Sequence, residues 1–93
     1  MNATHKEILD ITQEECAEVI VAISKISRFG LDHTKPGKPL TNRQHLAEEL
    51  GDLQAMINLC VDHHLVEMDD VLEAATNKIE KLKKWSSIFG NQA

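Results

Sequence analysis

The sequence predicts an all-α protein, a helical bundle of about three to four helices. Apolar residues recur at the spacing of amphipathic helices along three segments. No segment alternates Val, Thr or aromatic residues with polar ones, as a half-buried strand would. Both prolines and two of the four glycines fall within residues 29–41, which indicates a loop. We expect one domain over residues 1–93, because this length suits a single hydrophobic core.

The first two helices begin at matching start signals. THKE at residues 4–7 has the form of a capping box and predicts a helix that runs to about Phe29. TNRQ at residues 41–44 has the same form and predicts a second helix that runs to about His64. The two helices are therefore expected to follow each other through one loop.

The third helix has a weaker start signal. In EMDD, Asp69 or Asp70 is expected to cap it, and it should fray near Gly90. Its apolar stripe consists of Met68, Leu72, Ala75, Ile79 and Leu82. Trp85 lies at the edge of this stripe, where packing in the core or in a dimer is expected, with base stacking as the alternative.

Composition excludes several classes of protein. The hydrophobic fraction of 42% and the charged fraction of 27% fit an ordinary folded protein, and the net charge of −5 argues against a general nucleic-acid binder. No apolar run approaches the roughly 20 residues of a membrane span, and the N-terminus lacks a signal-peptide core. We therefore expect no membrane partner and a cytoplasmic location, in the host cytoplasm if the chain is viral. Cys16 and Cys60 lack metal-site spacing and are expected to be reduced core thiols.

Two pairs of acids stand out because they interrupt apolar stripes. With 100° per residue, Glu15 falls in the middle of the apolar face of the first helix and Glu18 at its edge. The apolar residues around Glu15 are Ile8, Ile11, Val19, Ala22, Ile26 and Phe29, with Leu9, Cys16, Ile20 and Ile23 to one side. In the second helix Glu49 takes the middle position and Asp52 the edge. The apolar residues around Glu49 are Leu46, Leu53, Met56 and Cys60.

If the two apolar faces pack together, four carboxylates converge at one interface. Two like charges about 4 Å apart repel by roughly 4 kcal/mol at an effective dielectric of 20, so a cation is needed. Carboxylates without Cys or His favour Mg²⁺ or Mn²⁺. A di-iron centre is disfavoured because no glutamate has a histidine three residues later. A single such acid would usually be a surface residue, but two pairs with this placement favour a metal site.

The motifs EECAE and EELGD resemble the EExxE and ExxD signature of the all-α nucleoside triphosphate pyrophosphohydrolases, in particular the short MazG-like members. The resemblance covers roughly residues 5–85. It implies a bundle assembled as a dimer or a dimer of dimers, with a site drawn from more than one helix and often from more than one subunit. It also implies Mg²⁺-dependent hydrolysis of a (d)NTP to the monophosphate and pyrophosphate, with Mn²⁺ as a possible substitute.

The resemblance assigns roles to particular residues. The acids that match the metal ligands are Glu15, Glu18, Glu49 and Asp52. Glu14 and Glu48, which precede them, match positions that assist a second metal or the attacking water, and they are the candidate catalytic residues. The base of the substrate stays open. One class of members converts dGTP to dGMP, so dGTP is one candidate.

Positive residues that suit phosphates gather in two places. One group lies at the end of the first helix and in the loop: Lys25, Arg28, Lys35, Lys38 and Arg43. The other lies in the third helix: Lys78, Lys81, Lys83 and Lys84. TNKIEKLKKW resembles a late family segment that contacts the nucleotide, although a solvated helix face explains the lysine run equally well. The candidate substrate-binding residues are Asn77, Lys78, Lys81, Arg28, Lys25 and Trp85.

The loop and the histidines carry weaker signals. The loop at residues 30–41 is longer than a helical hairpin needs and could close over a nucleotide with Lys35 and Lys38, or it is a plain mobile loop. His33 and His45 near the loop could reach a substrate. His63 and His64 are expected to complement the dipole at the end of the second helix.

Two other functions fit part of the sequence. A helical interaction module would explain the amphipathic helices, but it gives no reason for acids in the middle of apolar stripes. A metal- or nucleotide-binding regulator would keep the site and lack turnover. We expect the hydrolase, because it explains both the acids and the basic clusters.

Overall fold

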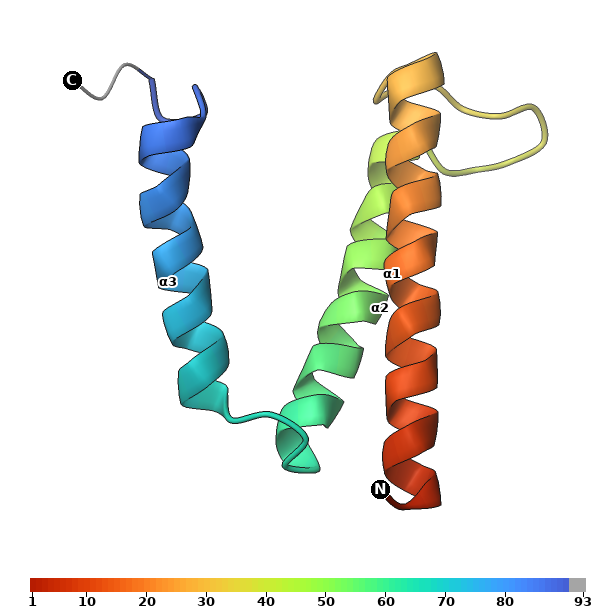
Figure 1. Ribbon diagram of the computed structural model, residues 1–93. Helices are drawn as coiled ribbons and strands as arrows, with labels where there is room; N and C mark the ends of the chain where they lie inside the picture. The colour runs from red at the N-terminus through yellow and green to blue at the C-terminus, as the bar shows by residue number, and fades with distance from the viewer. Residues whose placement is uncertain (91–93) are drawn as a thin grey trace.

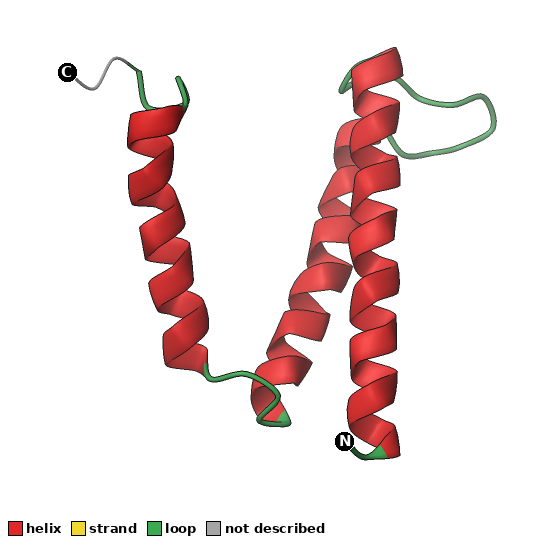
Figure 2. Ribbon diagram, viewed as in Figure 1, coloured by secondary structure: helices red, strands yellow, loops and turns green. Residues whose placement is uncertain are grey.

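The first two helices form an antiparallel hairpin, and the third stands apart from it. The computed structural model describes residues 1–90, in which α1 spans Ala3–Phe29, α2 spans Asn42–Asp62 and α3 spans Met68–Trp85. Figure 1 shows α1 and α2 side by side and α3 as a separate arm. Across the described part of the chain the elements are helices joined by loops, without a named strand (Figure 2). The predicted all-α fold is confirmed, with three helices.

The cap of α1 differs from the predicted capping box. Asn2, and not Thr4, is the N-cap, and its side-chain oxygen accepts a hydrogen bond of 2.7 Å from the backbone N–H of His5. Asparagine is among the best N-cap residues, so the helix begins before the THKE segment. At the other end Gly30 adopts a φ of 94°, which favours glycine, and its N–H donates to Ile26 O.

The start of α2 confirms the predicted capping box. The side chain of Thr41 accepts from the N–H of Gln44, and the side chain of Gln44 accepts from the N–H of Thr41. The helix ends at Asp62, slightly before the predicted end. His63 is the C-cap, and His64 adopts a left-handed φ of 58°, which turns the chain away from the helix axis.

Both predicted ends of α3 were wrong. The N-cap position is held by Glu67, which makes no side-chain capping bond, while Asp69 and Asp70 lie inside the first turn. There their negative charges stabilise the positive end of the helix dipole without a capping geometry. The helix ends at Trp85, before Gly90, where the Ser86 hydroxyl donates to Leu82 O at 2.7 Å.

The small core lies inside the hairpin. Ile8, Met56 and Cys60 form a buried cluster, and Ile11 and Leu65 pack against it. Further along the seam, Ala22 is 1% exposed. A small side chain at this position lets the two helix backbones approach closely. The interface predicted around Glu15 is thus present over most of its length.

Several residues of the predicted apolar face of α1 are exposed, namely Leu9, Cys16, Ile20, Ile23 and Phe29. Phe29, at the end of the helix, is 52% exposed and stacks on the ring of His33. Cys16 is a free, exposed thiol, whereas Cys60 is free and buried as predicted. Cys16 lies roughly 100° around the helix from Glu15, so it points away from α2.

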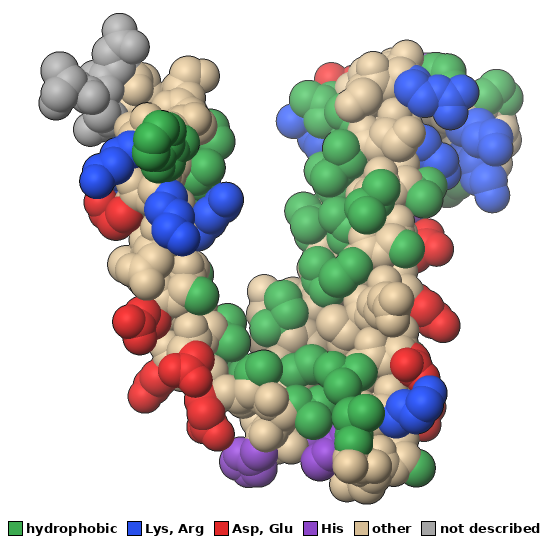
Figure 3. All heavy atoms as spheres, in the orientation of Figure 1, with side chains coloured by type: hydrophobic (Ala, Val, Ile, Leu, Met, Phe, Trp, Pro, Cys, Tyr) green, Lys and Arg blue, Asp and Glu red, His purple; other side chains and the backbone are tan. Residues whose placement is uncertain are grey.

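α3 has no buried residue, although one of its faces is apolar. Its exposed apolar residues include Met68, Leu72, Ile79 and Trp85. Figure 3 shows hydrophobic side chains on the facing sides of α3 and the hairpin, across an open gap. The molecule is accordingly flat, with principal extents of 46 × 42 × 14 Å. Within residues 1–90, none of the helices combines the length and apolarity needed to cross a membrane.

Candidate active site

Three acids from the two hairpin helices meet at the α1–α2 seam. One carboxylate oxygen each of Glu15, Glu49 and Asp52 lies within 4.8 Å of the other two. Glu15 and Glu49 are half-buried, and Asp52 is exposed. The group therefore combines a fixed inner part with an outer edge that a ligand from solvent can reach.

The hairpin explains why these residues meet. Glu15 lies on the face of α1 that carries the buried Ile8 and Ala22, and Glu49 lies on the face of α2 that carries Met56. Packing of the two stripes forces both carboxylates towards the seam. Asp52 follows Glu49 by nearly one turn and adds its oxygen from the seam's edge.

The pKa of Glu15 shows that, within residues 1–90, the three acids lack a positive counter-charge. Partial burial raises the pKa of Glu15, and the charges of Asp52, Glu49, Glu18 and Glu14 raise this pKa further, in that order. A carboxyl group surrounded by carboxylates loses its proton less readily unless a positive charge lies nearby. The donor set is made of hard oxygens and suits a divalent cation such as Mg²⁺.

Among residues 1–90, His45 is the one side chain that pairs with an acid of the cluster. Its Nε2 donates to Oε1 of Glu49 at 3.1 Å, one helical turn away. This bond restricts the Glu49 carboxylate, whose side chain is 13% exposed. From the sequence, His45 was expected only to reach a substrate, and its contact with Glu49 was not predicted. The i, i+4 spacing of His45 and Glu49 could have indicated it.

The other predicted acids lie outside the group of three. Glu18 is exposed, although its charge still helps to raise the pKa of Glu15. Glu14 is exposed and exerts the weakest of these effects. Glu48 is exposed next to Glu49 in the sequence. The structure thus assembles a central set of three acids, with further acids around it.

Of the predicted substrate residues, Lys25 shares a pocket with His45, which contacts the acids of the seam. It lines a pocket at the loop end of the hairpin together with Lys35, Lys38 and His45. Arg28 does not line this pocket, and its guanidinium lies 4.9 Å from the centre of the Phe29 ring. The basic cluster predicted at the end of the first helix is therefore divided into two parts.

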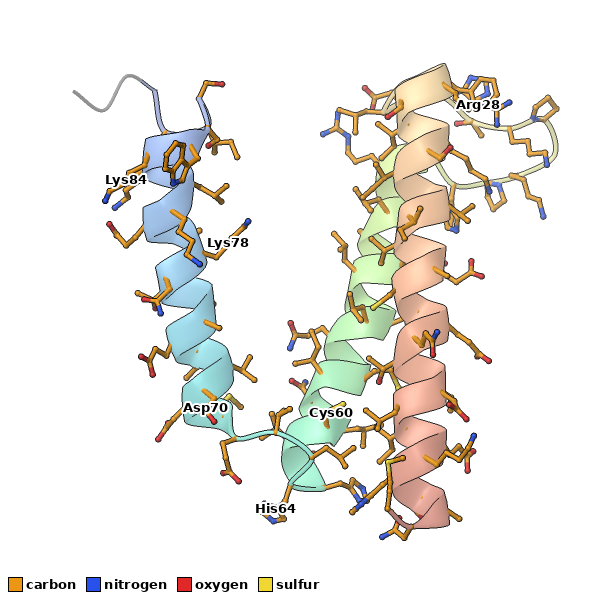
Figure 4. The ribbon with its side chains drawn as sticks, in the orientation of Figure 1. Arg28, Cys60, His64, Asp70, Lys78 and Lys84 are labelled. Carbon is orange, nitrogen blue, oxygen red and sulfur yellow. The ribbon has the colours of Figure 1, made fainter. Side chains whose placement is uncertain are left out.

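The predicted substrate residues of α3 lie on the other arm of the molecule. They are Asn77, Lys78, Lys81 and Trp85, all exposed. Figure 4 shows Lys78 and Lys84 on α3, and Arg28 at the loop end of the hairpin. Trp85 is 85% exposed, so its expected packing in the core of this chain is absent. Within one chain, α3 does not bring these side chains to the three acids.

Comparison with known protein families identifies the family of this chain. A family model described as the MazG nucleotide pyrophosphohydrolase domain matches residues 3–86, nearly the whole chain. The chain belongs to the MazG family. No curated protein and no solved structure matches the chain significantly.

Membership of the MazG family gives the three acids a chemical context. MazG domains are nucleotide pyrophosphohydrolases, and the family generally depends on a divalent metal. The MazG match extends over all three helices and includes both acidic motifs. The resemblance inferred from EECAE and EELGD is thereby confirmed.

Proposed function

We propose that this MazG-family protein hydrolyses a (deoxy)nucleoside triphosphate to the monophosphate and pyrophosphate, with Mg²⁺ at the acidic seam. The observation that carries the proposal is the convergence of Glu15, Glu49 and Asp52, whose oxygens lie within 4.8 Å of one another. Glu18 is proposed as a fourth ligand from the edge of the same seam. Mn²⁺ is expected to substitute, because it accepts the same oxygen ligands.

The chain's own groups have distinct tasks in this reaction. A bound divalent ion supplies charge neutralisation at the α-phosphate and favours ionisation of a nearby water. The exposed Glu14 and Glu48 are proposed to accept the proton of the attacking water. Attack at the α-phosphorus breaks the bond to the bridging oxygen, which leaves with pyrophosphate. The bond from His45 to Glu49 holds that carboxylate in place during the reaction.

A second copy of the chain is proposed to complete the site. By helical position, Ile20, Ile23 and Leu50 lie on the opposite side of the hairpin from Glu18 and Asp52. These apolar residues are 68%, 49% and 48% exposed. Like the apolar face of α3, they form an exposed hydrophobic surface. Burial of such surfaces in a dimer, or in a dimer of dimers, would remove them from water.

This assembly also gives the α3 residues a route to the nucleotide. Asn77, Lys78 and Lys81 are proposed to contact the substrate, with Trp85 packing between subunits or against the base. Their arm is separate from the hairpin of the same chain, so the hairpin they serve is proposed to belong to a partner. Arg28 is proposed as a further phosphate contact at the rim. The whole of residues 1–93 would then act as one domain of the assembly.

The test is a pyrophosphate-release assay on a panel of canonical and modified (d)NTPs that includes dGTP. Each reaction is run with Mg²⁺, with Mn²⁺ and with EDTA, and the products are separated by chromatography. We expect monophosphate plus pyrophosphate in equal amounts with either metal and none with EDTA. Binding of Mg²⁺ and nucleotide without turnover of any panel member would contradict the hydrolase and indicate a regulator.

A further inference from the structure

The loop end of the hairpin contains a pocket of about 400 Å³ with a pronounced positive lining. Lys25 of α1 and Lys35 and Lys38 of the loop contribute three ammonium groups. The remaining lining residues are Pro39, Leu40, Asn42 and His45, so the set includes no acid. In a chain of net charge −5 this is a local reversal of sign, which suits an anion.

The three lysines are available for such an anion. Within residues 1–90, no carboxylate forms an ion pair with any of them. Asp32, the acid of the same loop, is held by Arg43 instead, with Oδ1 3.2 Å from Nε. The charges of the pocket are therefore not neutralised by neighbouring acids of the described chain.

The loop that carries two of these lysines is tied to the hairpin. The buried Asn42 donates from Nδ2 to the carbonyl oxygen of Gly30 at 3.0 Å, which joins the two ends of the loop. The N–H groups of Asn42 and Arg43 donate back to His33 O and Leu31 O. These bonds tie the two ends of the loop to each other, and between them the N–H of Lys38 donates to Lys35 O at 2.9 Å, so both loop lysines lie on one turn.

The pocket continues the acidic seam. His45 lines the pocket and also bonds to Glu49, which joins the two sites through one side chain. Along α2, Glu49 lies one turn beyond His45, a rise of about 6 Å. Along α1, Lys25 follows Glu18 by seven residues, a rise of about 10 Å, on nearly the same side of the helix. Acids and lysines thus follow each other along one line.

We propose that this pocket is the subsite for the β- and γ-phosphates of the substrate, and therefore for the pyrophosphate product. The inference rests on the proposed function, because it places the α-phosphate at the acids. Lysine ammonium groups suit a terminal polyphosphate, which offers several charged oxygens without one fixed direction. The polyphosphate then runs towards the loop, and the nucleoside points along the seam away from it. Triphosphates are selected because shorter chains cannot reach the lysines.

The test compares two double variants with the same loss of charge. Lys35→Ala with Lys38→Ala removes the loop's share of the pocket. Lys6→Ala with Lys84→Ala removes two exposed lysines elsewhere, on α1 and α3. We expect the loop variant to lower kcat/KM for the triphosphate about tenfold and to weaken pyrophosphate inhibition by a similar factor. Inhibition by the nucleoside monophosphate should stay unchanged, and the control variant should resemble the wild type.

The outcomes separate this proposal from the proposed function. Equal effects of the two double variants would overturn the pocket, because only diffuse charge would then matter. Weakened monophosphate inhibition with unchanged pyrophosphate inhibition would also overturn it, since the pocket would then hold the nucleoside end. Calorimetric titration of the wild type and both variants with pyrophosphate and Mg²⁺ tests the pocket even if no nucleotide is hydrolysed. The subsite is supported if pyrophosphate binds more weakly to the loop variant than to the wild type, while the control variant binds it like the wild type.

Discussion

The hairpin and α3 have similar amphipathic sequences and opposite structural situations. In the hairpin, both helices begin with side-chain caps, and the apolar stripes bury each other around Ile8, Met56 and Cys60. α3 begins without a side-chain cap and buries none of its residues, although its apolar stripe is continuous. The stripe alone therefore does not determine burial. Burial requires a partner surface, and within residues 1–90 only α1 and α2 supply one to each other.

This difference gives the hairpin and α3 separate roles in the proposed enzyme. The hairpin holds the acids and the lysine pocket by its own packing, so these sites are present in a single chain. In the proposed assembly, the α3 residues act through contacts with a partner, because α3 buries none of its own residues. We therefore expect mutations in the hairpin to act on the chemistry directly, and mutations on the apolar face of α3 to act through assembly.

The largest effect is expected from the acids of the seam. Asp52→Asn removes a charge from the group of three, and turnover should fall by about a hundredfold or more because charge stabilisation at the phosphate is lost. Helix content by circular dichroism should be unchanged, since Asp52 is exposed. The matched control is Asp62→Asn, the same change on the same helix. Unchanged turnover in Asp52→Asn would contradict the metal site.

The next effect is expected from the apolar face of α3. Ile79→Asp should weaken the proposed dimer by about 2 kcal/mol or more, roughly thirtyfold in the dissociation constant, because it places a charge in an apolar interface. Ala74→Asp is the control, since Ala74 lies roughly 140° away around the helix. Light scattering with size-exclusion chromatography reports the mass of each variant. A monomeric wild type would contradict the proposed role of α3 in assembly, because α3 would then be stable without a partner.

A smaller effect is expected on the stability of the metal-free protein. The pKa of Glu15 is raised in the folded state, so the folded protein binds this proton more tightly than the unfolded chain does. Stability should therefore fall as the pH rises from the ordinary glutamate pKa through the raised one, and it should stay lower above that range. Glu15→Gln should remove this fall and raise Tm at neutral pH in EDTA. Melting curves across this pH range check it, with Glu7→Gln as a control that should melt like the wild type.

The smallest effect is expected from the helix caps. Thr41→Ala should lower the free energy of unfolding by about 1 kcal/mol, because it removes the capping bond to Gln44. Glu67→Ser should raise stability by about 0.5 kcal/mol, because it supplies the cap that α3 lacks. Chemical denaturation measures both. Destabilisation by Glu67→Ser would mean that the Glu67 carboxylate stabilises the start of α3 more than a serine cap does.

Much of the hairpin was predictable from local patterns. The capping box at Thr41 and the stripe around Glu15 depend on residues a few positions apart, and both are present. The prediction failed where two local signals compete. Asn2 and Thr4 are both residue types that cap helices, and in the structure Asn2 is the N-cap of α1. For α3 an aspartate cap was expected, but the helix begins earlier, so that both aspartates fall within its first turn.

The site was predictable to the extent that it depends on helix periodicity. The spacing of the acids indicated which carboxylates face the seam, and three of the four meet there. The gathering of Lys25, Lys35 and Lys38 was predicted, but the bond from His45 to Glu49 and the place of His45 in the lysine pocket were not. They depend on rotamers and on the path of the loop, which sequence spacing does not define.

The sequence by itself determined that the chain is helical, where its loop lies and which faces of the helices carry acids. These properties follow from backbone hydrogen bonding and helix periodicity, which act over a few residues. Only the tertiary structure decided that α1 and α2 pack together while α3 stays apart, and that Lys25 joins the loop lysines at one pocket. Such arrangements arise from contacts between distant segments, and their free energies depend on which surfaces meet.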